Sequence, residues 1–184
     1  MISAALPAQR VAVTSDIAGI TQLMQASILA LFPRYYDEQQ TASAALYIAH
    51  VDETLVNDGT YFVHEAGGEI VACGGWSRRG KLYTGSAEQE GIDRLLDPDT
   101  EAAHVRAMFV RSDWTRRGLG RAILESGRAA ARAEGFRSLD LMATLPGVPL
   151  YRSFGFRETR RHALTMPDGV TIDCVAMDRP VDPP

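Results

Sequence analysis

The sequence predicts a single α+β domain, residues 1–184, with a mixed β-sheet flanked by helices, and three observations lead to this class. A chain of 184 residues fits one domain and can bury roughly 70% of its unfolded surface without a metal or a disulfide. Its composition, 46% hydrophobic and 23% charged, is ordinary for a soluble globular protein. Its predicted strands and helices do not alternate as in a βαβ wheel, so the sheet is expected to be mixed.

The first hundred residues predict two helical segments and a hairpin. Apolar residues recur at helical spacing after Asp16, and Pro33 ends that pattern. The turn sequence Asn57-Asp58-Gly59 separates the second helical segment from the hairpin. The polar stretch after the hairpin is expected to be a long loop, which in a compact domain is usually functional or mobile. In chain order, these predicted elements are a strand at 10–13, helices at 16–33 and 37–56, strands at 61–65 and 69–76, and a loop at 78–100.

The second half predicts a long helix, a short helix and a closing hairpin among its strands. Gly135 is placed to cap the end of the long Ala-rich helix, and Gly155 ends the short helix. Pro167-Asp168-Gly169 is a turn sequence between the last two strands. In chain order, these elements are a strand at 103–110, a helix at 118–135, a strand at 138–143, a helix at 148–154, and strands at 156–165 and 171–177.

The net charge of −4 hides an asymmetry between two parts of the chain. Residues 104–161 hold twelve arginines against five acidic residues, whereas the remainder is acidic and contains Lys81, the only lysine. Arginine makes forked hydrogen bonds to phosphate oxygens. With an acidic chain overall and no interleaved aromatic residues, a small phosphorylated ligand is favoured over nucleic acid, which stays as a third alternative.

Location and redox state follow from what the sequence lacks. No apolar run approaches the ~18 residues of a membrane span, and the first ten residues do not resemble a secretory signal, so we expect a cytoplasmic protein without membrane contact. Cys73 and Cys174 lie singly in apolar strand-like runs and are expected to be buried thiols, with a disulfide left open. No metal-ligand spacing is found, so no metal is expected.

The segment from Met108 to Arg121 carries the chemistry. A strand runs into an Arg- and Gly-rich turn and directly into a helix, whose first main-chain N–H groups carry partial positive charge. Glycines let those amides approach an anion, so the turn is suited to bind a pyrophosphate. No P-loop string is present, and Gly118, Gly120 and Ala122 do not fit the dinucleotide fingerprint.

Two motifs resemble those of the GNAT superfamily of N-acetyltransferases. Gly118 and Gly120 match the glycines of its motif A, [QR]-x-x-G-x-[GA], whereas Thr115 departs from its first position. The run Leu150-Tyr151-Arg152-Ser153-Phe154-Gly155-Phe156 matches all four fixed positions of its motif B, L-Y-x-x-x-G-F. Thr144 and Gly147 stand where the family often has Asn and Ala. The resemblance covers about 75 residues well.

This resemblance implies a GNAT-like, splayed sheet and acetyl-CoA as cosubstrate. The parallel strands 103–110 and 138–143 are expected to separate, often at a β-bulge, and main-chain groups of the first strand pair with the pantetheine arm. The cofactor-binding half is then about 103–177 and the acceptor-shaping half about 10–100. The implied acetyl-CoA-binding residues are Met108, Phe109, Val110, Arg116, Arg117, Gly118, Leu119, Gly120, Arg121 and Thr144.

Tyr151 is the candidate acid of the reaction, because the resemblance places it beside the sulfur of the CoA thiolate that leaves. A phenol with a pKa of about 10 is protonated at neutral pH and can donate that proton. His104 falls where some family members carry a glutamate base, and an imidazole is suited to accept a proton near neutral pH. A strand histidine without a catalytic role is the alternative. Arg106 shares the strand face with His104 and could contact the acceptor or a phosphate.

The sequence supports an acetyl-CoA-dependent N-acetyltransferase that uses direct attack, without a covalent acyl-enzyme, on a small-molecule or peptide amine. The alternative is a non-catalytic acyl-CoA-binding sensor or regulatory domain. The acceptor is not readable, although tyrosine and tryptophan residues could line its pocket, and the C-terminal hairpin leaves a homodimer open through strand exchange. These aromatic candidates are Tyr35, Tyr36, Trp76 and Tyr83.

Overall fold

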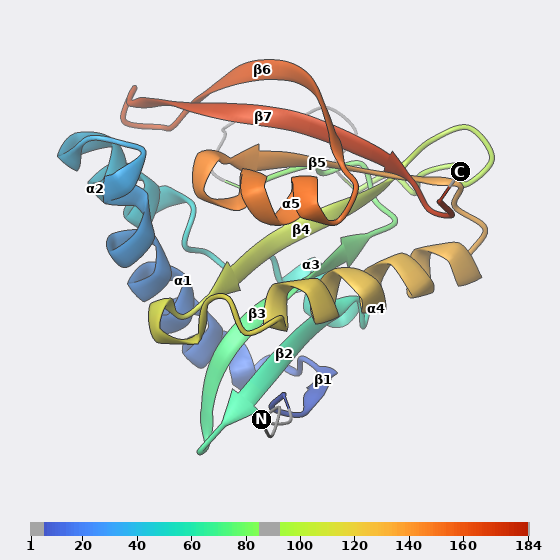
Figure 1. Ribbon diagram of the computed structural model, residues 1–184, viewed down its shortest axis with the longest axis horizontal. Coiled ribbons are helices and arrows are strands. Elements are labelled where there is room, and N and C mark those ends of the chain that lie inside the picture. The colour runs from blue at the N-terminus through green and yellow to red at the C-terminus, as the bar shows by residue number, and fades with distance from the viewer. Residues whose placement is uncertain (1–5, 85–92, 184) are drawn as a thin grey trace.

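The computed structural model describes residues 6–84 and 93–183, which are built around a mixed sheet of seven strands (Figure 1). The spatial order is β1-β2-β3-β4-β5-β7-β6. Neighbouring strands are antiparallel except β4 and β5, which are parallel. The strands are β1 (Gln9–Val11), β2 (Tyr61–Ala66), β3 (Glu69–Ser77), β4 (Ala103–Val110), β5 (Ser138–Thr144), β6 (Arg157–Thr165) and β7 (Thr171–Pro180).

Five α-helices and short 3₁₀ turns connect the described strands. The α-helices are α1 (Ile17–Leu31), α2 (Glu38–Tyr47), α3 (Glu53–Asn57), α4 (Leu119–Ala133) and α5 (Val148–Ser153). The 3₁₀ turns are η1 (Thr14–Asp16), η2 (Phe32–Arg34), η3 (Ser112–Trp114) and η4 (Leu145–Gly147). The mixed sheet with flanking helices confirms the predicted fold class.

The helices cover opposite faces of the sheet, and alternation along β3 separates the two faces. Cys73 packs with residues of α1 and α2 in one core, whereas Ala72 packs with Leu119 and Ile123 of α4. Trp76 lies on the α4 face, where it packs against α4 next to Gly127. Successive side chains of a strand point to opposite faces, so one strand serves both cores.

The helical pattern predicted at 37–56 was wrong as one continuous element. The chain forms α2 and then α3, with a break at residues 48–52. Asp37 begins α2 by accepting a hydrogen bond from the Gln40 N–H, and Asp52 begins α3 by accepting one from the Thr54 N–H. A helix start needs such an acceptor for its free N–H groups, so Asp52 favours a new helix over a continued one.

One described helical stretch, Thr14–Arg34, is long and apolar enough by composition to span a membrane. The sequence predicts a helix over most of this stretch, at 16–33, but no membrane span. In the structure α1 packs against β3 and β4, and the Ser27 hydroxyl of α1 donates a hydrogen bond to the Val110 carbonyl of β4. The core helix of a globular domain meets the same criteria of length and composition.

Candidate active site

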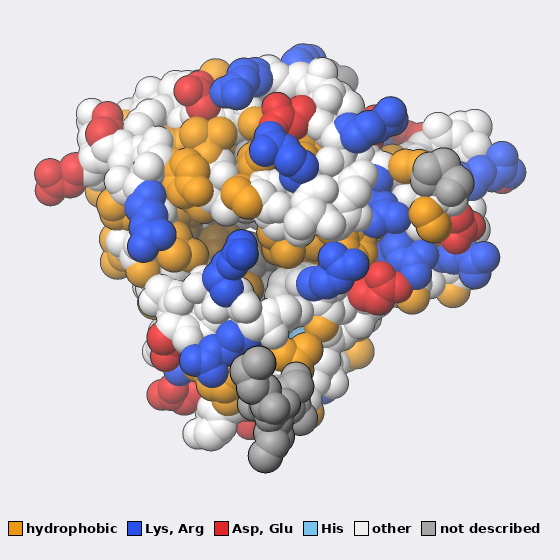
Figure 2. Space-filling view, in the orientation of Figure 1, with side chains coloured by type: hydrophobic (Ala, Val, Ile, Leu, Met, Phe, Trp, Pro, Cys, Tyr) orange, Lys and Arg blue, Asp and Glu red, His pale blue; other side chains and the backbone are white. Residues whose placement is uncertain are grey.

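A cleft opens where β4 and β5 separate. The two strands pair only at their first residues, Ala103 with Leu139 and His104 with Asp140, whereas β5 stays paired with β7 along its whole length. The cleft runs through the sheet, since Ile48 on its wall belongs to the core of α1 and α2, and Tyr151 to the core that includes α4 and α5. Figure 2 shows the hollow, with hydrophobic side chains in its floor and Lys and Arg side chains near its rim.

A β-bulge in β4 forms one wall of this cleft. Cys73 of β3 pairs with Phe109 and Gly75 with Arg106, so β4 has one residue more than β3 over this stretch. The extra residue is accommodated at Ala107, whose φ of 50° is left-handed. The bulge changes the direction of the side chains that follow, because Val105 belongs to the α4-side core and Ala107 packs on the α1-side core.

Gly74 permits this geometry. A Cβ atom at Gly74 would lie 2.2 Å from Met108 Sδ and 3.2 Å from Met108 Cα. Only glycine leaves β4 room to approach β3 at the bulge. Glycine inside a strand is a known sign of a bulge or a close backbone approach, and the Gly74-Gly75 pair was therefore an unused clue in the sequence.

The turn before α4 presents main-chain N–H groups to solvent. Arg116 has φ 64° and Gly118 has φ 91°, so two left-handed residues curve the backbone before the helix begins. Within the described residues, the N–H groups of 116–118 have no main-chain or side-chain acceptor, and the first N–H groups of α4 lack acceptors because they begin a helix. These consecutive donors lie at the turn where the sequence predicts an anion site, and that site stays a prediction.

Glycine is required at positions 118 and 120 for two different structural reasons. Gly118 starts α4 in a left-handed conformation, and an added Cβ there would meet nothing within 4 Å. An added Cβ at Gly120 would lie 2.7 Å from Leu150 Cδ2, so its absence lets α4 pack closely on α5. The two sequence motifs are therefore in contact with each other.

Arginines near this turn divide into paired and unpaired groups. Arg111 binds Glu69 and Asp113, and Arg128 binds Glu125. Arg116, Arg117 and Arg121 have no carboxylate within ion-pair distance among residues 6–84 and 93–183; the Arg117 guanidinium stacks on Trp114, and that of Arg121 on Phe154. Positive charge without a protein counter-ion thus surrounds the free main-chain donors.

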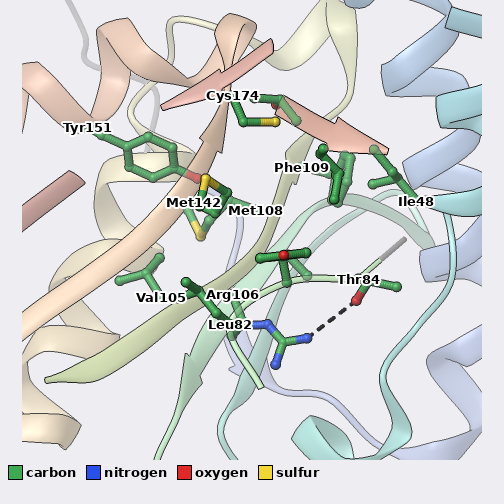
Figure 3. A pocket seen from close by; sticks show the side chains of 14 residues that line it. Ile48, Leu82, Thr84, Val105, Arg106, Met108, Phe109, Met142, Tyr151 and Cys174 are labelled. Carbon is green, nitrogen blue, oxygen red and sulfur yellow. Dashed lines mark hydrogen bonds between the residues drawn. The ribbon is translucent and has the colours of Figure 1, made fainter. Parts of the chain in front are cut away.

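Tyr151 lies on the cleft wall, and Figure 3 shows its hydroxyl directed toward the side chains of Met142 and Met108. Its ring packs edge-on against Phe156. Burial raises the pKa of the phenol above its usual value, so the hydroxyl carries its proton at neutral pH. Glycine at position 147 leaves space for the ring, since a Cβ there would lie 2.8 Å from Tyr151 Cε2.

The other predicted cofactor-binding residues lie in two places. Met108, Phe109 and Thr144 line the cleft, and Phe109 of β4 and Thr144 of β5 come from opposite sides of the splay. Val110 ends β4, next to the turn that leads to α4. Arg117, Leu119 and the other motif A residues lie at that turn, and Leu119 is buried beneath it.

His104 lies at the closed end of the splay rather than among the residues that line the cleft. Its Nδ1 forms a hydrogen bond with Asp140 of the neighbouring strand, and the residue is 8% exposed. If Nδ1–H donates to the carboxylate, Nε2 is the atom that can accept a proton. Its role as a base stays a prediction.

A buried ionic group lies at the wall of the cleft formed by Arg106 and Thr84. Arg106, 2% exposed, donates hydrogen bonds to the Lys81 carbonyl, to Asp52 Oδ2 at 3.0 Å and to Thr84 Oγ1. Burial raises the pKa of the Asp52 carboxyl, but the charges and hydrogen bonds of Arg106 and Lys81 outweigh it and hold that pKa below its usual value. The group joins β4, α3 and the segment after β3.

The four aromatic candidates for the acceptor pocket lie in different environments. Tyr83 lines the cleft, Trp76 is buried in the α4-side core, and Tyr35 is exposed. Tyr36 is buried; its hydroxyl donates a hydrogen bond to the Asp173 carbonyl and accepts one from the Leu145 N–H. Tyr36 thus holds the start of the turn that leads to Tyr151, a role that no sequence motif signals.

The splayed sheet, the bulge in β4 and the free amides before α4 together define a GNAT-type acyltransferase fold. A family model described as the acetyltransferase (GNAT) domain matches residues 57–158, more than half of the chain. The protein is therefore a member of the GNAT acetyltransferase family. No curated protein sequence was found to match the chain.

Solved structures confirm the fold over nearly the whole chain. A GCN5-related N-acetyltransferase from Rhodopseudomonas palustris aligns with TM-score 0.72 and 20% identity, covering 96% of each chain. The PaiA N-acetyltransferase from Thermoplasma acidophilum, solved with coenzyme A, aligns with TM-score 0.64 and 11% identity, covering 94% of this chain and 98% of that one. The yncA protein from Salmonella typhimurium, solved with its cofactor acetyl-CoA, aligns with TM-score 0.61 and 18% identity, covering 96% of this chain and 95% of that one.

The two cysteines are free and buried, as predicted. Within residues 6–84 and 93–183, no group of three or more His, Cys, Asp or Glu side chains is arranged to hold a metal ion. Residues 85–92, part of the long loop predicted at 78–100, lie outside the described residues.

Proposed function

We propose that this protein transfers an acetyl group from acetyl-CoA to a primary amine by direct attack, without a covalent acyl-enzyme. The observations that support the proposal are the cleft where β4 and β5 separate and the free amides before α4, which follow the end of β4 in the chain. A diphosphate bound at Gly118 and its neighbours would lead its pantetheine arm along β4 toward Tyr151. The solved structures of the same fold that hold coenzyme A or acetyl-CoA support this choice of ligand.

Each residue has a defined task in this reaction. A main-chain N–H of Met108–Val110 would hold the thioester oxygen, where negative charge develops as the amine attacks. Tyr151 would give its proton to the sulfur as the carbon–sulfur bond breaks. Arg116, Arg117 and Arg121 would neutralise phosphate charge around the main-chain donors.

His104 is the candidate base for the attacking amine. Because it lies at the closed end of the splay, it would act through ordered water rather than by direct contact. Asp140 would keep Nε2 available by accepting the Nδ1 proton.

The decisive test is acceptor-dependent release of the CoA thiol. Isothermal calorimetry with coenzyme A comes first, and a library of primary amines with acetyl-CoA follows, with free thiol as the signal. Binding together with amine-dependent thiol release is the expected result. Binding without release by any amine would support the sensor alternative, and no binding would refute both readings.

A further inference from the structure

A side chain of β2, a strand that does not pair with β4, makes a hydrogen bond to the bulge of β4. Tyr61 is the first residue of β2, and β3 lies between β2 and β4. Its hydroxyl donates a 2.6 Å hydrogen bond to the Ala107 carbonyl, at the residue with left-handed φ. The side chain must therefore cross β3 to reach the bulge.

The local sequence makes this crossing possible. Tyr61 pairs with Gly75, and a Cβ atom at Gly75 would lie 2.1 Å from the Thr60 carbonyl oxygen and 2.9 Å from Tyr61 Cα. Glycine thus lets β2 and β3 come close where Tyr61 begins. The ring is 1% exposed, and burial raises the phenol pKa well above its usual value, so the hydroxyl stays a donor.

The consequence for the cleft follows from peptide geometry. In a trans peptide the C=O and the next N–H point in opposite directions within one rigid plane. A hydrogen bond to the Ala107 carbonyl from the α1 side therefore directs the Met108 N–H away from that side. Met108 lines the cleft, where Figure 3 shows its side chain close to Tyr151.

We infer that Tyr61 is a positioning residue for acetyl transfer: its hydroxyl fixes the 107–108 peptide so that the Met108 N–H polarises the thioester carbonyl. The inference rests on the proposed function, in which a main-chain N–H of this strand is that donor. Tyr61 itself touches neither substrate, since it acts through the peptide that it holds.

The test compares Tyr61→Phe with Ser43→Ala, a control that also removes a buried hydroxyl donor, here to Asp168, away from the cleft. The readout is the carbonyl stretch of enzyme-bound acetyl-CoA labelled with ¹³C at the thioester carbon. Tyr61→Phe is expected to return the stretch toward its value in free solution and to lower kcat about tenfold, with the KM for acetyl-CoA within twofold of wild type. Ser43→Ala is expected to match wild type in all three.

An unchanged stretch and kcat in folded Tyr61→Phe would overturn the inference. If that variant does not fold, two unnatural residues at position 61 are compared instead. 4-Aminophenylalanine keeps a hydrogen-bond donor there, and 4-methylphenylalanine does not. If wild type binds no acetyl-CoA, the proposed function fails independently. In that case a crystal structure of Tyr61→Phe tests the positioning role by itself. An Ala107 that keeps its left-handed φ would refute the role, and an Ala107 that leaves the left-handed region would support it.

Discussion

At the residue scale, the site depends on small residues as much as on reactive ones. Gly147 lies under the Tyr151 ring and Gly74 lies against Met108, and in both cases a Cβ atom would overlap the functional residue. The frequent alanine of the family at position 147 would not fit this placement of the ring. The absence of a side chain at Gly147 therefore lets the Tyr151 ring take its position.

Tyr151→Phe should remove the proton donor and leave the ring. We expect kcat to fall by about 10² or more, as loss of a general acid does, while coenzyme A binding stays within about twofold of wild type. Turnover with saturating acetyl-CoA and calorimetry measure the two quantities. Tyr47→Phe, a change of the same type on α2, is the control. Undiminished turnover would remove Tyr151 from the mechanism.

His104→Gln tests the candidate base. If His104 accepts the amine proton, the acidic limb of the kcat/KM profile against pH should disappear, and Asp140→Asn should weaken it through loss of the oriented imidazole. The measurement is kcat/KM between pH 5 and pH 9. An unchanged profile in the folded His104→Gln variant would leave His104 only its structural contact with Asp140.

At the element scale, a glycine with left-handed backbone lies at each end of α4. Gly118 begins the helix with φ 91°, and Gly135, with φ 92°, follows its end. Gly120 allows contact with Leu150 of α5. The helix that carries the free amides thus packs on β3 and β4, and its first turn also touches Leu150 of α5, the element that carries Tyr151.

Gly118→Ala should weaken ligand binding more than it weakens the fold. The left-handed backbone would cost about 1 kcal/mol with a side chain, but the added methyl would contact no protein atom. It would stand in the space that the diphosphate needs, so we expect the Kd for coenzyme A to rise about tenfold or more. Gly59→Ala, at φ 69° and equally free of contacts, is the matched control and should change stability alone. Thermal unfolding and calorimetry separate the two effects, and equal Kd values for both variants would contradict the assignment.

At the scale of the whole molecule, buried polar contacts join the predicted acceptor-shaping half, about 10–100, to the predicted cofactor-binding half, about 103–177. The Tyr36 hydroxyl connects the end of η2 to β7 and to the turn after β5. Asp52 connects α3 to β4 through Arg106, and Lys81 adds the segment after β3. Removing one charge of such a group leaves the other buried without compensation.

Asp52→Asn should lower the free energy of unfolding by about 3 kcal/mol at pH 7. The folded-state pKa of Asp52 is lowered, so its contribution is present above the unfolded pKa near 4 and is lost as pH falls through the folded value. Wild type should therefore lose stability on acidification more steeply than Asp52→Asn. Urea unfolding between pH 7 and pH 3 measures both, and parallel curves would show that Asp52 is not ionised in the native state.

The local pattern of this sequence already determined the strand 103–110, the helix from Gly118 and the two motifs, because hydrophobic period, glycine turns and free helix amides are local properties. The break at Asp52 has a local cause, the cap on the Thr54 N–H, which the helical pattern predicted at 37–56 did not take into account. The Tyr36 bridge and the hold of Tyr61 on Ala107 needed the tertiary structure. Each joins residues far apart in the chain, and nothing in a local pattern encodes which distant hydroxyl meets which carbonyl. The resemblance led us to expect a bulge in the strand, but the packing of β2, β3 and β4 decided where it lies and what holds it.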